Sequence, residues 1–247
     1  MVKIPKDPKE IFQDFTKDYK NAFGSDLISI ILHGSGASGD YIPKKSDINF
    51  LIVLSEKGIE ILERSFKIIT KWRKRSVNTP LFLTKDYILS SIDTFPVEFF
   101  NMKMNYVLVY GEDVLSDLTF EREHMRIECE RELKAKLLQL RQGYLQTSHK
   151  TGHMQLLIAS SITTFIAIFK AILYLKDIKI PAHKDQTLAL MCEKFNLNYE
   201  IFSTLLNIKK KERKPSRNKM DSLIHEYISE IKRISSIVDT MDITNSS

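Results

Sequence analysis

Residues 31–54 read "ILHGSGASGDYIPKKSDINFLIVL", two apolar runs separated by a connection that contains three glycines and a proline. The first run begins at residue 27 and is rich in β-branched side chains, which predicts a buried strand over residues 27–32. The second run predicts a strand over residues 47–54. The glycines and the proline predict a tight loop with room for one helical turn. The stretch therefore predicts two strands joined through a glycine turn.

The rest of residues 1–118 mixes helical and strand-like segments. Their patterns predict helices over residues 8–23, 58–75 and 86–92 and further strands over residues 79–84 and 95–102. Residues 106–115 are expected to end this half of the chain near its surface, with a break at Gly111. This part of the chain is therefore expected to form a mixed sheet flanked by helices.

From residue 119 onward, one helical pattern follows another. Helices are predicted over residues 121–146, 154–176, 186–195, 199–210 and 221–241. Short connections between five helices imply a bundle. The sequence thus predicts an α+β chain, with the mixed sheet and its helices over residues 1–118 and an all-α helical bundle over residues 119–247.

The composition is that of an ordinary globular protein. With 247 residues, 43% of them hydrophobic and 28% charged, the chain can bury a core and is neither disordered nor collagen-like. Cys129 and Cys192 lie far apart, which fits a reducing compartment better than a disulfide framework. The N-terminus lacks the apolar segment of a signal peptide. We therefore expect a cytoplasmic protein, and the sequence leaves open a homodimer as well as a monomer.

The net charge of +6 is concentrated in one segment. Residues 209–219, "KKKERKPSRNK", carry seven basic side chains and one acidic side chain, while the rest of the chain has equal numbers of each. A general nucleic-acid-binding protein would be basic over a wider surface. The run is interpreted first as a solvated loop between helices and second as a patch that attracts phosphates, RNA or an acidic partner.

One segment is apolar enough to raise the question of a membrane. Residues 156–175 are long enough to cross a bilayer, but they contain four serine and threonine side chains and the charged Lys170. A helix buried in the centre of the bundle explains this composition better. No membrane partner is therefore expected.

Polar groups gather around the glycine turn. Nucleotidyl transfer needs backbone N–H groups at such a turn to bind a triphosphate, and carboxylates to hold Mg²⁺. Gly34 and Ser35 follow the first strand. Asp47 and Asn49 are two residues apart on a predicted strand, so they share a face. Glu98 lies between apolar neighbours in another predicted strand, where an unpaired carboxylate would be costly to bury, so we expect it on a face with other polar groups.

Residues 33–50 contain the motif "HGS", eleven further residues and then "DINF". This pattern resembles the signature of the DNA polymerase beta-like nucleotidyltransferase superfamily. In that signature an acid, an apolar residue and a second acid follow the glycine turn. Glu98 matches the third acid of the superfamily in its place along the chain. The order of the two halves is also similar to the layout of the aminoglycoside nucleotidyltransferases. The motif covers residues 27–102, and the helical half offers only a similarity of architecture.

The resemblance implies transfer of a nucleoside monophosphate from a nucleoside triphosphate, with Mg²⁺ or Mn²⁺, to a small-molecule, RNA or protein acceptor. It implies a nucleotidyltransferase-type sheet in the first half of the chain. The implied residues are Gly34 and Ser35 for nucleotide binding, Asp47 and Glu98 for the metal, and Asp47, Asn49 and Glu98 for catalysis. Lys44 and Lys45 are candidate nucleotide-binding residues too, interpreted first as solvated loop charges and second as triphosphate contacts. Glu128, Glu130 and Glu132 are predicted first as ion-pair partners on a helix surface. By the same resemblance, one of these three glutamates could instead reach the site as a general base.

Asn49 departs from the motif, which has a second acid at this position. An asparagine offers one neutral oxygen, and its NH₂ group cannot bind Mg²⁺. One metal ion bound together with a triphosphate is compatible with a single carboxylate, whereas a second, bridged metal ion loses its ligand. The alternative function is therefore a catalytically impaired nucleotide-binding or protein-interaction module of the same fold.

Overall fold

The computed structural model describes residues 3–211 and 215–242 of the protein. The chain divides between Phe120 and Glu121 into two compact units, called unit 1 and unit 2 below. The boundary expected from the sequence lies at residue 118, two residues earlier in the chain. Each unit has its own buried hydrophobic residues, so each is described by itself.

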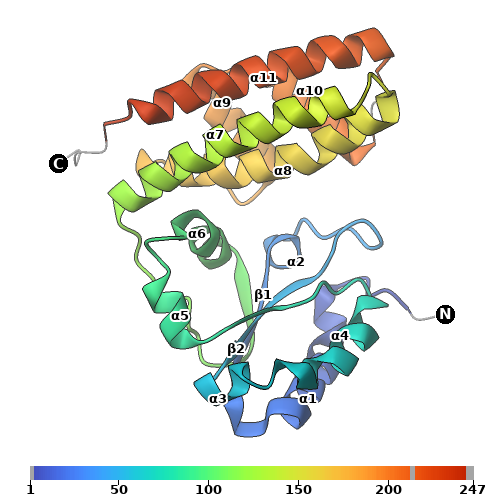
Figure 1. Ribbon diagram of the computed structural model, residues 1–247, viewed down its shortest axis with the longest axis vertical. Coiled ribbons are helices and arrows are strands. Elements are labelled where there is room, and N and C mark those ends of the chain that lie inside the picture. Colours follow the sequence, from blue (N-terminus) through green and yellow to red (C-terminus); the bar gives the residue numbers. More distant parts are fainter. Residues whose placement is uncertain (1–2, 212–214, 243–247) are drawn as a thin grey trace. The chain divides into compact units, whose positions relative to one another are not determined.

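Unit 1 is built around a four-stranded mixed sheet (Figure 1). Its strands are β1 (Leu27–His33), β2 (Asn49–Leu54), β3 (Leu81–Leu83) and β4 (Tyr106–Gly111). They lie in the order β3-β2-β1-β4, with β1 antiparallel to both neighbours and β2 parallel to β3. The two strands predicted from the opening stretch are thus the central pair of the sheet.

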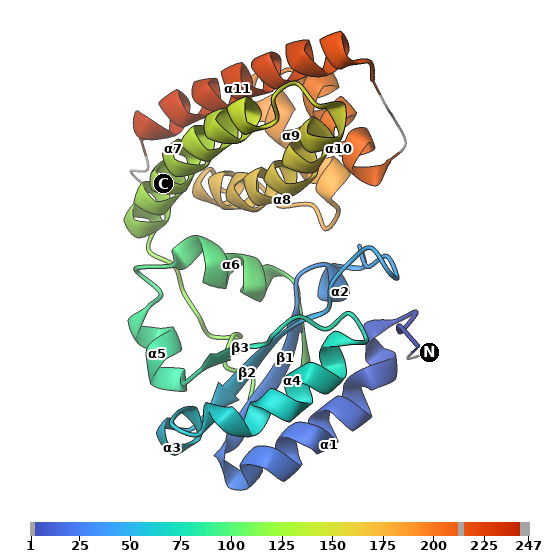
Figure 2. The same ribbon diagram turned by 45° about the vertical axis from the view of Figure 1, so that its right-hand side comes forward.

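Helices cover both faces of this sheet. In chain order they are the 3-10 helix η1 (Pro8–Ile11), α1 (Phe12–Phe23), the 3-10 helix η2 (Gly24–Asp26), α2 (Ser35–Ser38), α3 (Glu56–Ile59), the 3-10 helix η3 (Leu62–Ser65), α4 (Phe66–Arg73), α5 (Lys85–Ser90) and α6 (Pro96–Met104). Figures 1 and 2 show α1 and α4 on one face and α5 and α6 on the other. The predicted fold class is confirmed for this half of the chain.

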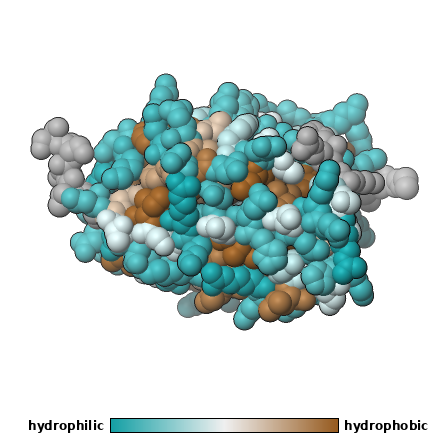
Figure 3. All heavy atoms as spheres, turned by 90° about the horizontal axis from the view of Figure 1, so that it is seen from above, coloured by the Kyte–Doolittle hydropathy of each residue, from teal (hydrophilic) through white to brown (hydrophobic). Residues whose placement is uncertain are grey.

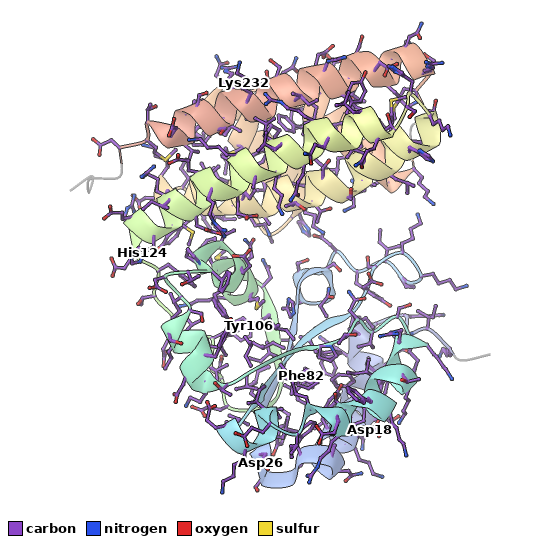
Figure 4. The ribbon with its side chains drawn as sticks, in the orientation of Figure 1. Asp18, Asp26, Phe82, Tyr106, His124 and Lys232 are labelled. Carbon is purple, nitrogen blue, oxygen red and sulfur yellow. The ribbon has the colours of Figure 1, made fainter. Side chains whose placement is uncertain are left out.

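An aromatic core fixes the central strands against α1 and α4. Phe15 stacks on Phe50 with ring centroids 4.1 Å apart and meets Trp72 edge-on at 5.3 Å. Asp18, labelled in Figure 4, joins the two helices, because its Oδ2 accepts from Trp72 Nε1 at 2.7 Å and from Lys71 Nζ at 2.6 Å. Burial of each large apolar side chain contributes about 1.5–3 kcal/mol. This packing decides which face of β2 turns inward.

Two segments that follow β3 differ from the prediction. Residues 95–102, predicted as a strand, largely form α6, and residues 106–111, predicted as a surface ending, form β4 and complete the sheet. A short apolar run does not by itself distinguish a helix from a buried strand. Pro96 stands in the first turn of α6, where proline is favoured, and the buried Val97 and Phe100 are three residues apart, as a helix requires.

The helix predicted over residues 58–75 is divided into three shorter helices. Ser55 caps α3, its Oγ accepting from the Gly58 backbone N–H at 3.1 Å. Ser65 Oγ donates to the Leu62 carbonyl at 2.6 Å where η3 passes into α4. Such local bonds from serine compete with a continuous helix. The break leaves α4 to bring Trp72 into the core.

Unit 2 is a bundle of helices, which confirms the predicted all-α half. They are α7 (Arg122–Gln146), α8 (Thr151–Leu175), α9 (Lys184–Phe195), α10 (Tyr199–Lys210) and α11 (Arg217–Asp239). On the face of unit 2 shown in Figure 3, polar side chains (teal) surround smaller apolar areas (brown), as expected for a face in contact with water.

Helix α8 packs in the core of unit 2. Phe165 meets Tyr227 of α11 at a centroid distance of 5.7 Å, and Phe169 meets Phe202 of α10 at the same distance. Within the described residues, α8 is the one helix whose length and composition would allow it to cross a membrane, yet 56% of its most apolar window is buried inside the protein. These contacts favour the predicted role as a core helix.

Candidate functional site

The chain turns sharply at Gly34, between β1 and α2. Its φ of 69° and ψ of −145° lie in a region that residues with a side chain rarely adopt. Among the described residues, a Cβ built at this position would meet one heavy atom within 4 Å, Asn49 Nδ2 at 3.5 Å, so backbone conformation rather than space selects glycine. The Gly34 carbonyl accepts from the N–H groups of Ala37 and Ser38 at 3.1 and 3.0 Å. Gly34 is exposed and Ser35 is half-buried, so a ligand has access to the turn.

The strand register places three polar side chains in one row beside this turn. His33, the last residue of β1, pairs with Asn49 of β2 on one side and with Tyr106 of β4 on the other. Directly paired residues project from the same face of a sheet, and here that face is the one opposite the aromatic core. Asp47 lies just before β2 and is exposed. The structure thus brings the predicted Asp47–Asn49 segment to the end of the sheet where the glycine turn lies.

Asn49 has a partner that the sequence analysis missed. Asn78 Nδ2 donates to Asn49 Oδ1 at 2.8 Å. Backbone bonds align the two segments, because Ile48 N–H donates to the Ser76 carbonyl at 2.9 Å and Asn78 N–H donates to the Ile48 carbonyl at 3.0 Å. The available signal in the sequence was a polar residue immediately before the third predicted strand, which alone does not identify a partner.

The loop between α2 and β2 carries the two predicted lysines. Within it, the Ser46 N–H donates to the Ile42 carbonyl at 2.8 Å, and the Ile42 N–H donates to Ser46 Oγ at 3.1 Å. Lys44 has a left-handed backbone conformation, with a φ of 66°. The side chains of Lys44 and Lys45 are both exposed on this hydrogen-bonded turn, so both are accessible to a charged ligand.

Glu98 lies on a helix, so its predicted place within a strand is wrong. It stands in the first turn of α6 and is exposed, so its carboxylate does not bear the desolvation cost that the strand interpretation implied. An acidic residue in a first turn is stabilised by the helix dipole, which gives Glu98 a structural role beside the proposed metal role. Figures 1 and 2 show α2 and α6 at the same end of the sheet.

Two members of the row beside the turn have shifted pKa values. Burial lowers the pKa of His33 from its usual value, so the imidazole is neutral near pH 7. Tyr106, labelled in Figure 4, donates from its OH to Asp113 Oδ2 at 2.8 Å. Burial first, then this hydrogen bond and the charges of Asp113 and Asp117, raise the pKa of Tyr106 to about 12. Both side chains are therefore uncharged near neutral pH.

The donor set suits one divalent cation better than two. Over the described ranges, no three His, Cys, Asp or Glu side chains form a group that could hold a metal ion. Asp47 offers a carboxylate, whereas Asn49 Oδ1 already accepts a hydrogen bond from Asn78. Mg²⁺ commonly takes one or two protein carboxylates together with phosphate oxygens. These residues fit one Mg²⁺ bound with a triphosphate, and they supply no bridging carboxylate at position 49.

The three glutamates at residues 128, 130 and 132 of α7 form ion pairs as predicted, but Glu128 is buried, so its predicted place on the helix surface is wrong. The Arg131 guanidinium donates twice to Glu128, at 2.7 and 2.6 Å. The two i,i+4 pairs have N–O distances of 2.5 Å for Glu130–Lys134 and 3.7 Å for Glu132–Lys136. Each of the three carboxylates therefore has an ion-pair partner on α7.

The basic run is partly occupied by contacts within unit 2. Lys209 is half-buried and donates to Thr163 Oγ1, and burial lowers the pKa of its ammonium group. Lys210 Nζ lies 2.8 Å from Asp185 Oδ2. Residues 212–214 of the run lie outside the described residues. The described part therefore favours local contacts for the first two lysines over a fully solvated patch.

No protein-family profile matches the chain, and no curated protein matches its sequence. Among solved structures it is similar to spectinomycin adenyltransferase AAD(9) from Enterococcus faecialis, in a crystal structure with ATP and spectinomycin. The TM-score is 0.54 at 16% sequence identity, and the match covers 91% of this chain and 99% of the other. At this identity the likeness shows that the chain has the fold of that adenyltransferase, a mixed sheet with helices followed by an all-helical region.

Proposed function

We propose that the protein is a cytoplasmic nucleotidyltransferase that uses Mg²⁺ or Mn²⁺. It would transfer a nucleoside monophosphate from a nucleoside triphosphate to an acceptor and release pyrophosphate. The observation that carries this proposal is the Gly34 turn at the end of β1, in register with the Asp47–Asn49 segment, on a fold shared with an adenyltransferase solved with ATP. ATP is accordingly the first nucleotide to test.

Unit 1 would hold the triphosphate through its backbone at the turn. Because Gly34 has no side chain, a phosphate can approach the main chain closely and accept from its N–H groups. Ser35 adds a hydroxyl at the same turn. The exposed Lys44 and Lys45 add positive charge in the adjoining loop. Backbone donors and positive charge together favour a ligand with several negative charges.

Carboxylates would complete the site. Asp47 would hold one Mg²⁺, and Glu98 on α6 is the second candidate carboxylate. When bound, the metal neutralises phosphate charge and stabilises the pyrophosphate that leaves. An acceptor oxygen attacks the α-phosphorus as the bond to pyrophosphate breaks, so the chain contributes by positioning and charge rather than by a covalent intermediate.

We infer that the acceptor is a small molecule. The similar structure contains both ATP and spectinomycin, which supports an acceptor of that size. An RNA acceptor is less well supported, because Lys209 and Lys210 of the basic run already contact Thr163 and Asp185. A protein would instead be a binding partner in the alternative function, in which no group is transferred.

The test is a turnover assay with labelled nucleotides. The protein is incubated with each of the four nucleoside triphosphates and Mg²⁺ or Mn²⁺, with and without spectinomycin and other aminoglycosides, and pyrophosphate and labelled acceptor are measured. We expect release that requires both metal and acceptor and that stops when EDTA is added. Tight nucleotide binding without release under any of these conditions would contradict the proposed activity.

A second function, nucleotide binding without turnover, is favoured by one observation. Asn49 Oδ1 already accepts a hydrogen bond from Asn78, so the position where the motif has its second acid offers one neutral, partly engaged oxygen in place of a bridging carboxylate. A module of this kind would bind ATP and Mg²⁺ through the glycine turn and Asp47 and would signal occupancy to a partner protein. ATP binding by calorimetry, combined with a negative turnover assay, would favour this function.

A further inference from the structure

The amide of Asn49 has a defined orientation. Its Oδ1 accepts from Asn78 Nδ2 at 2.8 Å, so the oxygen side of the amide faces residue 78. Its Nδ2 is the heavy atom that lies 3.5 Å from the position of a Cβ on Gly34. The two ends of one amide therefore face in different directions, the acceptor toward Asn78 and the donor toward the glycine turn.

Asn78 is itself held in place by the main chain. The backbone bonds between Ile48 and residues 76 and 78 fix the segment on both sides of Val77, which forms an isolated parallel bridge with Ile48. Ser76 has a left-handed φ of 63°, which turns the chain into this position. The donor of Asn78 thus meets the acceptor of Asn49 because of backbone geometry, before any ligand binds.

We propose that Asn49 is a phosphate-binding residue and not a metal ligand, and that Asn78 is the positioning residue that orients it. This inference rests on the proposed nucleotide site. With its oxygen engaged, Asn49 presents N–H donors to the turn, and an N–H group hydrogen-bonds a phosphate oxygen directly. A carboxylate at the same place would instead repel the phosphate until a cation lay between them. Asn49 therefore lets the site bind a triphosphate with less dependence on metal.

The orientation can be reversed by changing Asn78 alone. A carboxylate only accepts hydrogen bonds, so in Asn78→Asp the Asn49 amide has to turn over to donate to it, which brings Oδ1 toward the Gly34 turn. In Asn78→Ala the amide loses its orientation without a new charge. Thr79→Asp is the matched control, because it adds the same charge at the next residue, also exposed, without changing the amide pair.

The experiment is a titration of ATP by calorimetry with the full chain, once in EDTA and once in Mg²⁺. We expect wild type to bind ATP in EDTA and Asn78→Asp to bind it about tenfold to a hundredfold more weakly, the effect of one hydrogen bond to a charged group. The ATP affinity of Thr79→Asp in EDTA should fall clearly less than that of Asn78→Asp. The affinity of Asn78→Ala should lie between the affinities of these two variants. In Mg²⁺ the gap between wild type and Asn78→Asp should narrow, because the turned oxygen can then face the cation.

Side-chain amide resonances give a readout that does not depend on affinity. With ¹⁵N-labelled asparagine, the Asn49 NH₂ signal of wild type should shift on addition of ATP in EDTA, and that shift should be absent in Asn78→Asp. If wild type binds ATP with Mg²⁺ but Asn78→Asp and Thr79→Asp behave alike, the orienting role is wrong and the nucleotide site stands. If wild type binds no ATP with or without metal, the orienting role of Asn78 and the proposed nucleotide site are both wrong. Thermal unfolding verifies that each variant is folded.

Discussion

Gly111 of β4 lies against Ile28 of β1 so closely that a Cβ on residue 111 would stand 1.9 Å from the Ile28 carbonyl oxygen. That oxygen accepts from the Glu112 N–H at 3.2 Å, and the neighbouring Ser29 Oγ donates to the Tyr110 carbonyl at 3.2 Å. Gly111 has a φ of 81°. The close approach therefore anchors one end of β4, the strand whose other end places Tyr106 beside His33.

Replacing Gly111 with alanine should destabilise unit 1 strongly. The new Cβ overlaps backbone and not a movable side chain, and the positive φ adds strain, so we expect a loss of roughly 2–5 kcal/mol. Trp72 is the single tryptophan of the chain and lies in the core of unit 1, so its fluorescence in urea measures this unfolding. Gly24→Ala is the control, with a φ of 55° and no described heavy atom near its Cβ position. An equal loss of unfolding free energy in Gly111→Ala and Gly24→Ala would contradict the steric argument.

Asp47→Asn should remove most metal-dependent nucleotide binding. Asp47 is the carboxylate nearest in sequence to the row beside the turn, and the change keeps shape while removing charge. We expect ATP affinity in Mg²⁺ to fall about tenfold or more toward its value in EDTA, measured by calorimetry. Asp14→Asn on the exposed face of α1 removes the same charge elsewhere. An unchanged Mg²⁺ dependence would show that Asp47 does not hold the metal.

Asn49→Asp should make the site more dependent on metal. The change is nearly isosteric, and it introduces a second carboxylate two residues from Asp47. Without metal the crowded charges repel, so we expect the apo protein to lose about 0.5–1 kcal/mol of stability, and Mg²⁺ to restore it by mass action. Pyrophosphate release should rise. A wild type that turns over as fast as the variant would show that Asn49 is part of a working site.

The stability of unit 1 should depend on pH through His33. Burial lowers its pKa in the folded protein, so the unfolded chain binds the proton more readily. The stabilisation by neutral His33 is present above the unfolded pKa of about 6.5 and is lost as pH falls through the lower folded value. Urea unfolding monitored by Trp72 fluorescence from pH 7.5 to pH 5 measures this slope. His33→Gln should reduce it, and an identical slope in the variant would assign the pH dependence to other groups.

Tyr106 should ionise only in strongly alkaline solution. Burial and the hydrogen bond to Asp113 raise its pKa to about 12, so the absorbance difference between wild type and Tyr106→Phe should show a titration near that pH. Because the folded state holds this proton more tightly than the unfolded state, stability should fall as pH rises from about 10 to 12. In Asp113→Asn the titration should move toward 10. A midpoint near 10 in the wild type would contradict the proposed environment.

The central part of the fold and the motif could be predicted from the sequence because both depend on short-range patterns. The apolar runs before Gly34 and after Asp47 became β1 and β2, and the long amphipathic and apolar patterns of residues 121–241 became the bundle. Each of these segments is long or strongly periodic, so local propensity and tertiary packing agree.

The rest depended on contacts that local patterns do not contain. Residues 95–102 and 106–111 are two short apolar runs of similar composition, and only pairing with β1 decides which one joins the sheet. The partnership between Asn49 and Asn78 spans 29 residues and depends on the backbone alignment of Ile48 with residues 76–78. Glu98 matches the third acid of the motif only by its order along the chain, and that order does not reveal a helix.

The register that aligns His33 with Asn49 also protects the sheet against misfolding. A slip of one residue between β1 and β2 would turn Asn49 toward Phe15 and Trp72 and expel Phe50 from the core. Burial of an unpaired amide costs about 1–3 kcal/mol, and the lost aromatic contact adds to that penalty. The residue that marks the site therefore also excludes the incorrect pairing of the two central strands.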